Sequence, residues 1–84
     1  MALFVYCKNI GGRKFNTYYH HWENAKNQLE TDLAEMLQSG GKITSHRDGM
    51  NVAKGWYDYD YTIITHRGET GELSIIQAFY RDDP

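Results

Sequence analysis

The clearest pattern along the chain is a stripe of apolar residues spaced three or four positions apart. The stripe consists of Tyr18, Trp22, Ala25, Leu29, Leu33, Met36 and Leu37. This spacing matches the 3.6-residue period of an α-helix and predicts an amphipathic helix from Thr17 or Tyr18 to Ser39. Asn16 or Thr17 is the expected N-cap, because a short side-chain oxygen can accept a hydrogen bond from a free amide of the first turn. The glycines at 40–41 are expected to end the helix.

The segments on either side of this helix have the β-branched and aromatic residues typical of strands. Residues 2–8 form the first predicted strand, and the turn residues Asn9 and Gly11–Gly12 allow a short second strand at 13–15. Three strands are predicted after the helix, at 42–46, 56–66 and 72–81. A hairpin loop at 68–71 is expected between the last two of them. One helix can cover only one face of such a sheet. The sequence therefore predicts a single α+β domain over 1–84. One long amphipathic helix packs on a mainly antiparallel sheet of four to five strands, in the order β(β)αβββ.

Alternation within the strand at 56–66 separates two kinds of side chain. One side carries three tyrosines and an isoleucine: Tyr57, Tyr59, Tyr61 and Ile63. The other side carries a tryptophan, two aspartates and a threonine: Trp56, Asp58, Asp60 and Thr62. Burying two unpaired aspartates is costly, so the aspartates are expected to face water and the tyrosines to face the helix.

The first and last strands carry apolar residues on both sides. In the last strand these residues are Ile76, Ala78 and Tyr80 on one side and Leu73, Ile75 and Phe79 on the other. Alternation therefore does not decide which side of either strand meets the helix. Both faces of the sheet are partly apolar, and one helix covers one face, so the other face is the expected contact surface.

Composition narrows the class of protein. Of the 84 residues, 40% are hydrophobic and 24% are charged, which is typical of a globular domain and not of a disordered chain. The net charge of −2 argues against a duplex-DNA-binding protein, which needs a basic face. The single cysteine, Cys7, excludes an internal disulfide and favours a reducing, cytoplasmic setting. The apolar segment 2–7 is too short to span a membrane, so no membrane partner is expected.

No arrangement typical of an active site is found. The four histidines, His20, His21, His46 and His66, do not form a metal-binding motif. Cys7 lies in an apolar run and is expected to be a small buried side chain. We therefore predict no enzyme, no cofactor and no metal. The alternative is a small metal-dependent hydrolase, in which histidines from the helix start and two strand ends converge with Asp58 or Asp60.

The sequence favours a non-catalytic protein-binding module that uses the acidic and aromatic sheet face. Its predicted partner-binding residues are Trp56, Asp58, Asp60 and Tyr80. The expected partner is a protein with a basic surface. Because carboxylates can occupy positions meant for phosphates, an inhibitor of a nucleic-acid-handling protein is one form of this hypothesis. The small size and the missing catalytic pattern suit accessory proteins of mobile elements. A homodimer is also expected, through the second apolar face or through edge strands.

A second hypothesis concerns the basic N-terminal hairpin. Lys8, Arg13 and Lys14 lie close in sequence to Tyr6 and Phe15. Basic and aromatic side chains together can hold single-stranded nucleic acid through phosphate pairing and base stacking. Three basic residues are few for this purpose, and the negative net charge of the chain works against binding nucleic acid.

Overall fold

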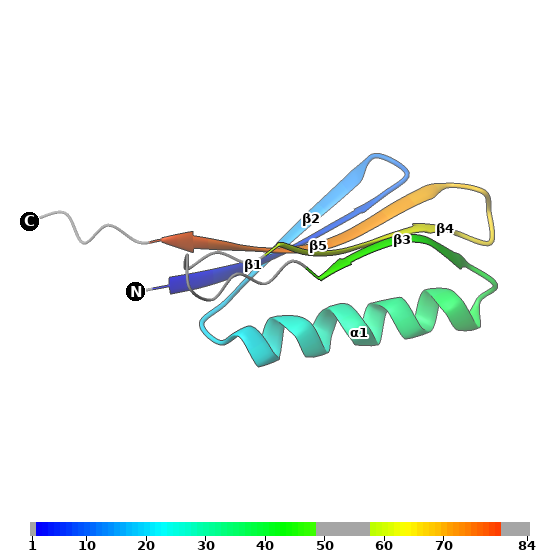
Figure 1. The fold of residues 1–84 in the computed structure, drawn as a ribbon. Coiled ribbons are helices and arrows are strands. Elements are labelled where there is room, and N and C mark those ends of the chain that lie inside the picture. The colour runs from blue at the N-terminus through cyan, green and yellow to red at the C-terminus, as the bar shows by residue number, and fades with distance from the viewer. Residues whose placement is uncertain (1, 49–57, 80–84) are drawn as a thin grey trace, which may run out of the picture.

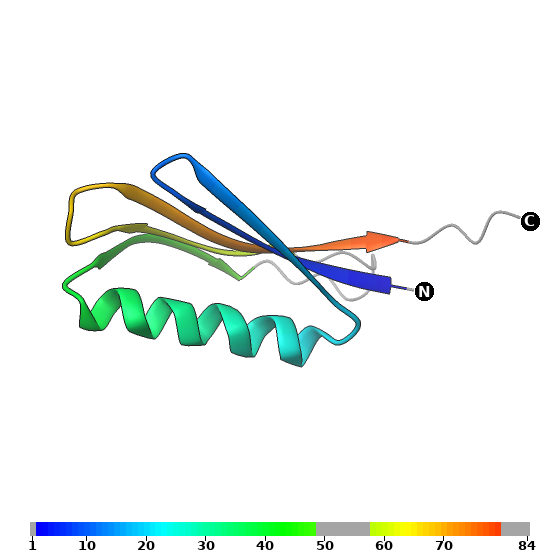
Figure 2. The ribbon, with the colours of Figure 1, turned by 180° about the vertical axis from the view of Figure 1, so that it is seen from behind.

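The computed structural model describes residues 2–48 and 58–79 and shows a helix layer packed on a sheet layer (Figure 1). In chain order the elements are β1 (Ala2–Ile10), β2 (Arg13–Tyr19), α1 (Trp22–Gln38), β3 (Lys42–Asp48), β4 (Asp58–Ile64) and β5 (Thr70–Phe79). All neighbouring strands are antiparallel, and the sheet has the order β2-β1-β5-β4-β3. The helix runs along one face of the sheet, as the view from behind also shows (Figure 2). The predicted α+β class is confirmed, with five strands in the order ββαβββ.

The first hairpin is longer than its sequence pattern indicates. Gly11 and Gly12 have φ angles of 58° and 84°, which a two-residue type I′ turn requires and which match the twist of the flanking strands. From this turn β2 pairs with β1 without interruption, from Ile10–Arg13 to Phe4–Tyr19. The second strand therefore has seven residues instead of the three predicted.

The predicted start of the helix is wrong. Thr17 and Tyr18 belong to β2, and the helix begins at Trp22 with His21 as an N-cap that makes no side-chain hydrogen bond. Tyr18 matches the helical spacing by chance. Its β-branched and aromatic neighbours favour a strand, and pairing with β1 satisfies their backbone groups.

The helix ends as predicted, at the glycine pair. The amide of Gly40 donates to the carbonyl of Leu37 at 3.1 Å, and the amide of Gly41 donates to the carbonyl of Met36 at 2.9 Å. Gly40 has a φ of 104°, which is the left-handed conformation of a Schellman cap. This close turn leads directly into β3.

The core lies between α1 and the central strands. Its buried residues are Phe4, Tyr6, Ala25, Leu29, Leu33, Tyr59, Ile63, Leu73 and Ile75. Tyr59 and Ile63 thus face the helix as predicted. The structure also resolves the ambiguity in β5, because Leu73 and Ile75 are buried under the helix whereas Ile76 is exposed.

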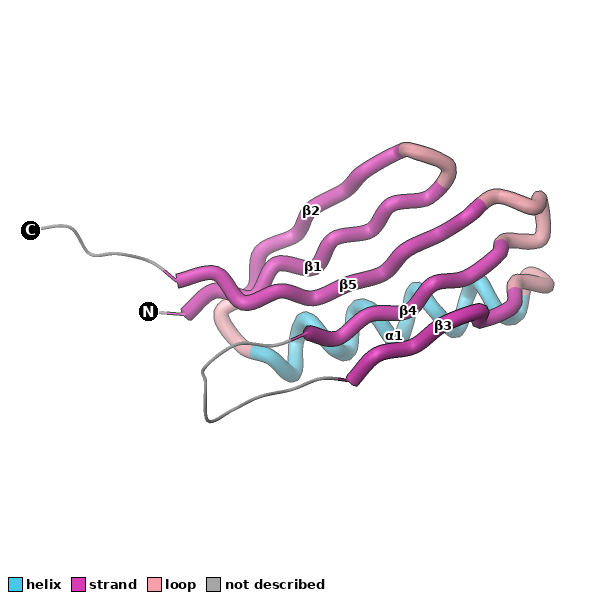
Figure 3. Tube along the Cα trace, turned by 45° about the horizontal axis from the view of Figure 1, so that its top comes forward, coloured by secondary structure: helices cyan, strands magenta, loops and turns pink. Residues whose placement is uncertain are grey.

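The C-terminal strand lies at the centre of the sheet (Figure 3). β5 pairs with β1 on one side and with β4 on the other, so β2 and β3 form the two edges. The five-residue turn between β4 and β5 is closed by hydrogen bonds from Thr65 N–H to the Glu69 carbonyl and from Gly68 N–H to the Thr65 carbonyl. Of the strand predicted at 56–66, residues 56 and 57 lie outside the described residues, and so does the predicted contact residue Tyr80.

Gly41 should be intolerant of a side chain. A Cβ at this position would lie 2.8 Å from the backbone oxygen of Met36 and 3.2 Å from that of Ile64. Since backbone atoms cannot move aside without disturbing the helix cap, we expect Gly41→Ala to lower the free energy of unfolding by about 1–3 kcal/mol. Urea titration followed by circular dichroism measures this. Gln38→Ala, at an exposed helical position, is the control and should change stability by less than about 0.5 kcal/mol. Equal midpoints for both variants would contradict the prediction.

Candidate functional site

The sheet face turned away from α1 carries a row of apolar side chains. Val5 pairs with Tyr18 on one side and with Ile76 on the other, so the three side chains lie beside one another across β2, β1 and β5. Val5 is only 7% exposed although it faces away from the helix, whereas Tyr18 is 64% and Ile76 49% exposed. We call these three residues the apolar row. No part of the described chain covers it.

A shallow polar groove of about 360 Å³ lies next to the apolar row. It is lined by Ser45, Arg47, Asp60, Tyr61, Thr62, Glu72, Ser74 and Ile76. Arg47 Nε and Nη2 donate to Oδ2 of Asp60 at 3.0 and 2.8 Å. Asp60 thus faces away from the helix, as predicted, but its charge is neutralised by Arg47. Glu72 is an exposed acid on the same face.

Arg47 is a site residue that sequence reasoning missed. It lies 13 positions before Asp60, on a different strand, and the β3–β4 register places the two opposite each other. A long polar stretch separates them in the sequence, so no local pattern indicates the pair. Of the other predicted partner-binding residues, Asp58 begins β4 in register with Ile76, whereas Trp56 lies outside the described residues.

The histidines do not come together. His21 precedes the first turn of α1, whereas His66 lines a cavity beside Met36 near the other end of the helix. A helix of 17 residues separates these ends by roughly 25 Å. Nδ1 of His46 donates a hydrogen bond to the backbone oxygen of Asp60 at 2.9 Å, and the His46 ring stacks on the ring of Tyr61 in β4. Within residues 2–48 and 58–79, no group of three metal-ligating side chains is found. The convergence that the hydrolase hypothesis requires is therefore not present.

Cys7 is less buried than expected. It is half-buried on the face away from the helix, between Asn16 and Ser74 in the strand pairing. His46 pairs with Tyr61 on the helix side of the sheet. Opposite faces of the sheet therefore separate the thiol from this imidazole, and the two do not form a nucleophile–base pair.

The predicted nucleic-acid-binding residues fall on both faces of the first hairpin. Lys8 and Phe15 share the helix side of the first hairpin, where the Lys8 ammonium lies 5.7 Å from the centre of the Phe15 ring. Lys14 alternates to the opposite face. Arg13 lines a cavity of about 300 Å³ at the far end of the helix. The structure therefore does not assemble Lys8, Arg13, Lys14 and Phe15 into one basic patch.

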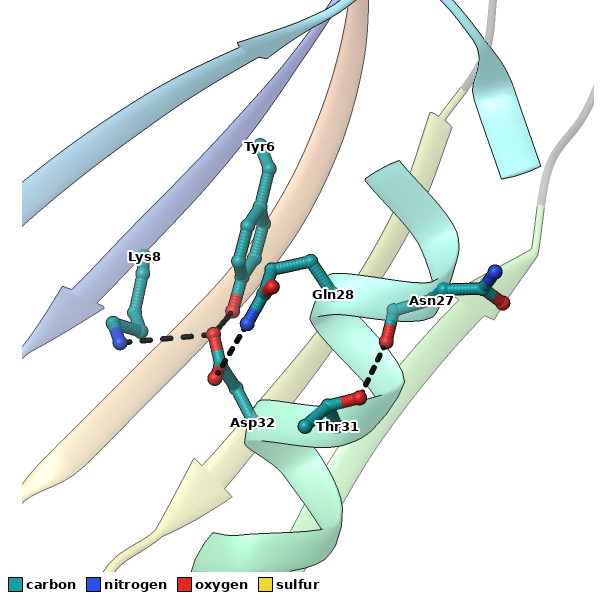
Figure 4. Close-up of polar contacts among 6 residues, drawn as sticks. All are labelled: Tyr6, Lys8, Asn27, Gln28, Thr31 and Asp32. Atoms are coloured by element: carbon teal, nitrogen blue, oxygen red, sulfur yellow. Dashed lines mark hydrogen bonds and ion pairs between the residues drawn. The ribbon is translucent and has the colours of Figure 1, made fainter. Parts of the chain in front are cut away.

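Asp32 anchors the helix to β1 through a small polar cluster (Figure 4). The hydroxyl of Tyr6 donates to Oδ2 of Asp32 at 2.7 Å, and Nε2 of Gln28 donates to Oδ1 at 3.1 Å. The ammonium of Lys8 lies 3.6 Å from Oδ2, so this base is neutralised within the molecule. Burial, together with the hydrogen bond and the charge of Asp32, raises the pKa of Tyr6 well above its ordinary value. The cluster stabilises the contact between helix and sheet. Because it pairs the Lys8 ammonium with Asp32, Lys8 is not free to bind a ligand.

The cavity at the end of the helix is lined by charged side chains of both signs. Its lining contains both arginines and glutamates: Ile10, Arg13, Glu35, Met36, Ser39, Thr65, His66, Arg67 and Glu69. The hydroxyl of Ser39 donates to the carbonyl of Glu35 at 3.0 Å, and that of Thr65 accepts from the amide of Glu69 at 3.2 Å. Both hydroxyls thus make local hydrogen bonds that cap a helix and a turn, and neither is paired with a base that would activate it.

Comparison of the chain with protein-family models, with curated proteins and with solved structures gave no match. The described helix is too short and too polar to cross a membrane.

Tyr6 should make stability depend on pH in the alkaline range. Because the pKa of Tyr6 is raised by folding, the unfolded chain loses this proton first, above pH 10.0, and folding is then disfavoured as the pH rises. We expect the free energy of unfolding to fall above that pH. Tyr6→Phe should reduce the steepness of this fall, by up to about 1.4 kcal/mol per pH unit once the unfolded chain has lost the proton, and urea titrations between pH 8 and 11 measure it. The same steepness in both proteins would contradict the prediction.

Proposed function

We propose that this protein is a non-catalytic protein-binding module that contacts its partner through the sheet face opposite α1. The apolar row of Tyr18, Val5 and Ile76 is the observation that supports this most directly. Tyr18 and Ile76 are the exposed members of the row, on either side of the buried Val5, and exposed apolar side chains gathered on one face of a small domain are typical of a contact surface. Aromatic residues at such a surface supply a large rigid contact area with a polar end.

The charges around the row favour a partner with a basic surface. Glu72 is an exposed acid on the same face, and Asp58 occupies the β4 position in register with Ile76. The bases of this face include Lys14 at the edge strand β2 and Arg47, which is paired with Asp60. The helix layer on the other side of the sheet adds to the negative charge of the molecule, because it carries Glu23, Glu30, Asp32 and Glu35 against Lys26, with Asp32 paired to Lys8 and Glu30 to Lys26. These charges repel a phosphate backbone and attract basic side chains. An inhibitor that occupies the nucleic-acid site of a basic protein is consistent with this arrangement.

Ile76→Lys should abolish partner binding without unfolding the domain. A lysine in the apolar row replaces a buried apolar contact with a charge of the same sign as the partner's surface. Leu37→Lys is the matched control, because Leu37 is a similarly exposed aliphatic residue, 39% against 49%, in the helix layer. The measurement is affinity capture from cell extract with wild type and both variants, followed by mass spectrometry.

We expect the same protein on wild type and Leu37→Lys and a loss of more than about tenfold on Ile76→Lys. Circular dichroism of both variants checks that the fold is kept. A partner retained equally by all three proteins would contradict the proposed face. A partner lost only on Leu37→Lys would place the contact on the helix instead.

A further inference from the structure

The two edges of the sheet differ in how they are protected against pairing with another chain. β3 has an irregularity in its pairing between Ile43 and Ser45, and the hydroxyl of Thr44 donates to the backbone oxygen of Thr62. Charged residues stand at both its ends, at Lys42 and at 47–48. Bulges and charges are the devices by which natural sheets prevent edge-to-edge association.

β2 lacks the irregular pairing, and its charged residues, Arg13 and Lys14, stand only at the end next to the turn. Its pairing with β1 is continuous over all seven residues, and the strand contains no proline. It exposes an aromatic side chain on each face, Phe15 on the helix side (57% exposed) and Tyr18 on the opposite side (64%). A regular edge strand with apolar side chains on both faces can add another strand.

The direction of the free backbone groups follows from the turn. Across a two-residue hairpin turn, Ile10 and Arg13 form the first hydrogen-bonded pair, and such pairs then alternate along an antiparallel ladder. Consistent with this alternation, the amide of Gly11 donates to the carbonyl of Thr70 on the other side of β1. The backbone groups of Lys14, Asn16 and Tyr18 therefore point outward from the edge of the sheet.

We propose that two copies of this chain form a dimer by antiparallel pairing of their β2 strands, centred on Asn16. In this register the outward-pointing residues meet each other: Asn16 meets Asn16 of the partner copy, and Lys14 meets the partner's Tyr18. Each such pair can exchange two backbone hydrogen bonds. The sheet then continues through both copies.

The side chains of β2 are complementary to themselves in this register. Lys14 lies beside the partner's Tyr18, and Arg13 lies beside the partner's Tyr19, so each cation meets an aromatic ring and not another cation. Phe15 lies beside the partner's Thr17, a favourable combination of aromatic and β-branched residues. The two-fold axis repeats every contact, which is the symmetry most common among dimers.

This dimer places both helices on one side of the joined sheet and both apolar rows on the other, because its two-fold axis stands perpendicular to the sheet. The dimer would thus present two equivalent copies of the apolar row, side by side, to a partner protein. The inference does not depend on the proposed function, since β2 pairing uses backbone groups at the edge and leaves Ile76 in place.

The test measures the molar mass of the intact protein by light scattering and sedimentation at micromolar concentrations. We expect wild type at twice the mass of the 9.8-kDa chain. Tyr18→Lys places a cation opposite the partner's Lys14 at two symmetric positions and should raise the dissociation constant roughly tenfold or more. Adding Lys14→Glu to Tyr18→Lys makes the opposing charges attractive and should restore the dimer.

Two further variants locate the interface. Asn16→Pro removes an amide that points away from β1, so the fold should persist, as checked by circular dichroism, while the dimer is lost. Ile43→Lys is the matched control on the other edge, where an exposed apolar residue is replaced without effect on mass.

Three outcomes would overturn the inference: a wild-type monomer even at hundreds of micromolar, dissociation by Ile43→Lys or Ile76→Lys instead of Tyr18→Lys, or no restoration by the double variant. A monomer that still captures its partner through Ile76 would refute the dimer and leave the proposed function standing. A dimer that captures no partner would support the inference about β2 and refute the proposed function.

Discussion

The packing of α1 on one face of the sheet is the contact on which the rest of the molecule depends. Leu29 has no exposed surface, and it meets strand residues that are equally buried, such as Ile63 and Ile75. A chain of this size buries only about 60% of the surface that its unfolded form exposes, less than a larger domain does, so losing this layer would leave little to stabilise the fold. One helix cannot cover both faces. The opposite face must therefore remain in contact with water or with another protein, and this constraint determines where a partner can bind.

The central position of β5 joins the two halves of the chain. The β1–β2 hairpin and the β3–β4 pair share no hydrogen-bonded contact until the C-terminal strand lies between them. Pairings of such long sequence separation make folding slow, because loop closure costs entropy before the contacts form.

Gly71 on β5 is buried, and a Cβ there would lie 3.1 Å from the terminal methyl of Met36. The last turn of α1 thus packs closely over the middle of the sheet.

Two acids show how the fold changes the chemistry that a sequence suggests. Asp60 pairs with Arg47 from the neighbouring strand, and Asp32 binds Tyr6 and Lys8 from β1. Both interactions use charges within the molecule, so neither acid is left free for catalysis. The face away from α1 keeps two exposed apolar side chains, Tyr18 and Ile76, with exposed charges of both signs near them, Lys14 and Glu72.

Local patterns in the sequence determined much of this protein: the helix stripe, the glycines that end it, and the alternation that turns Tyr59 towards the helix and Asp60 away from it. Each depends on residues a few positions apart, so the sequence shows them directly. The start of α1 was missed because Tyr18 fits both a helical and a strand spacing, and pairing with β1 decided between them. The strand order, the side of β5 that is buried, the Arg47–Asp60 pair and the separation of Lys8 from Lys14 were decided by tertiary structure. All of these depend on which strands become neighbours, and neighbours in a sheet are chosen by the packing of the whole domain.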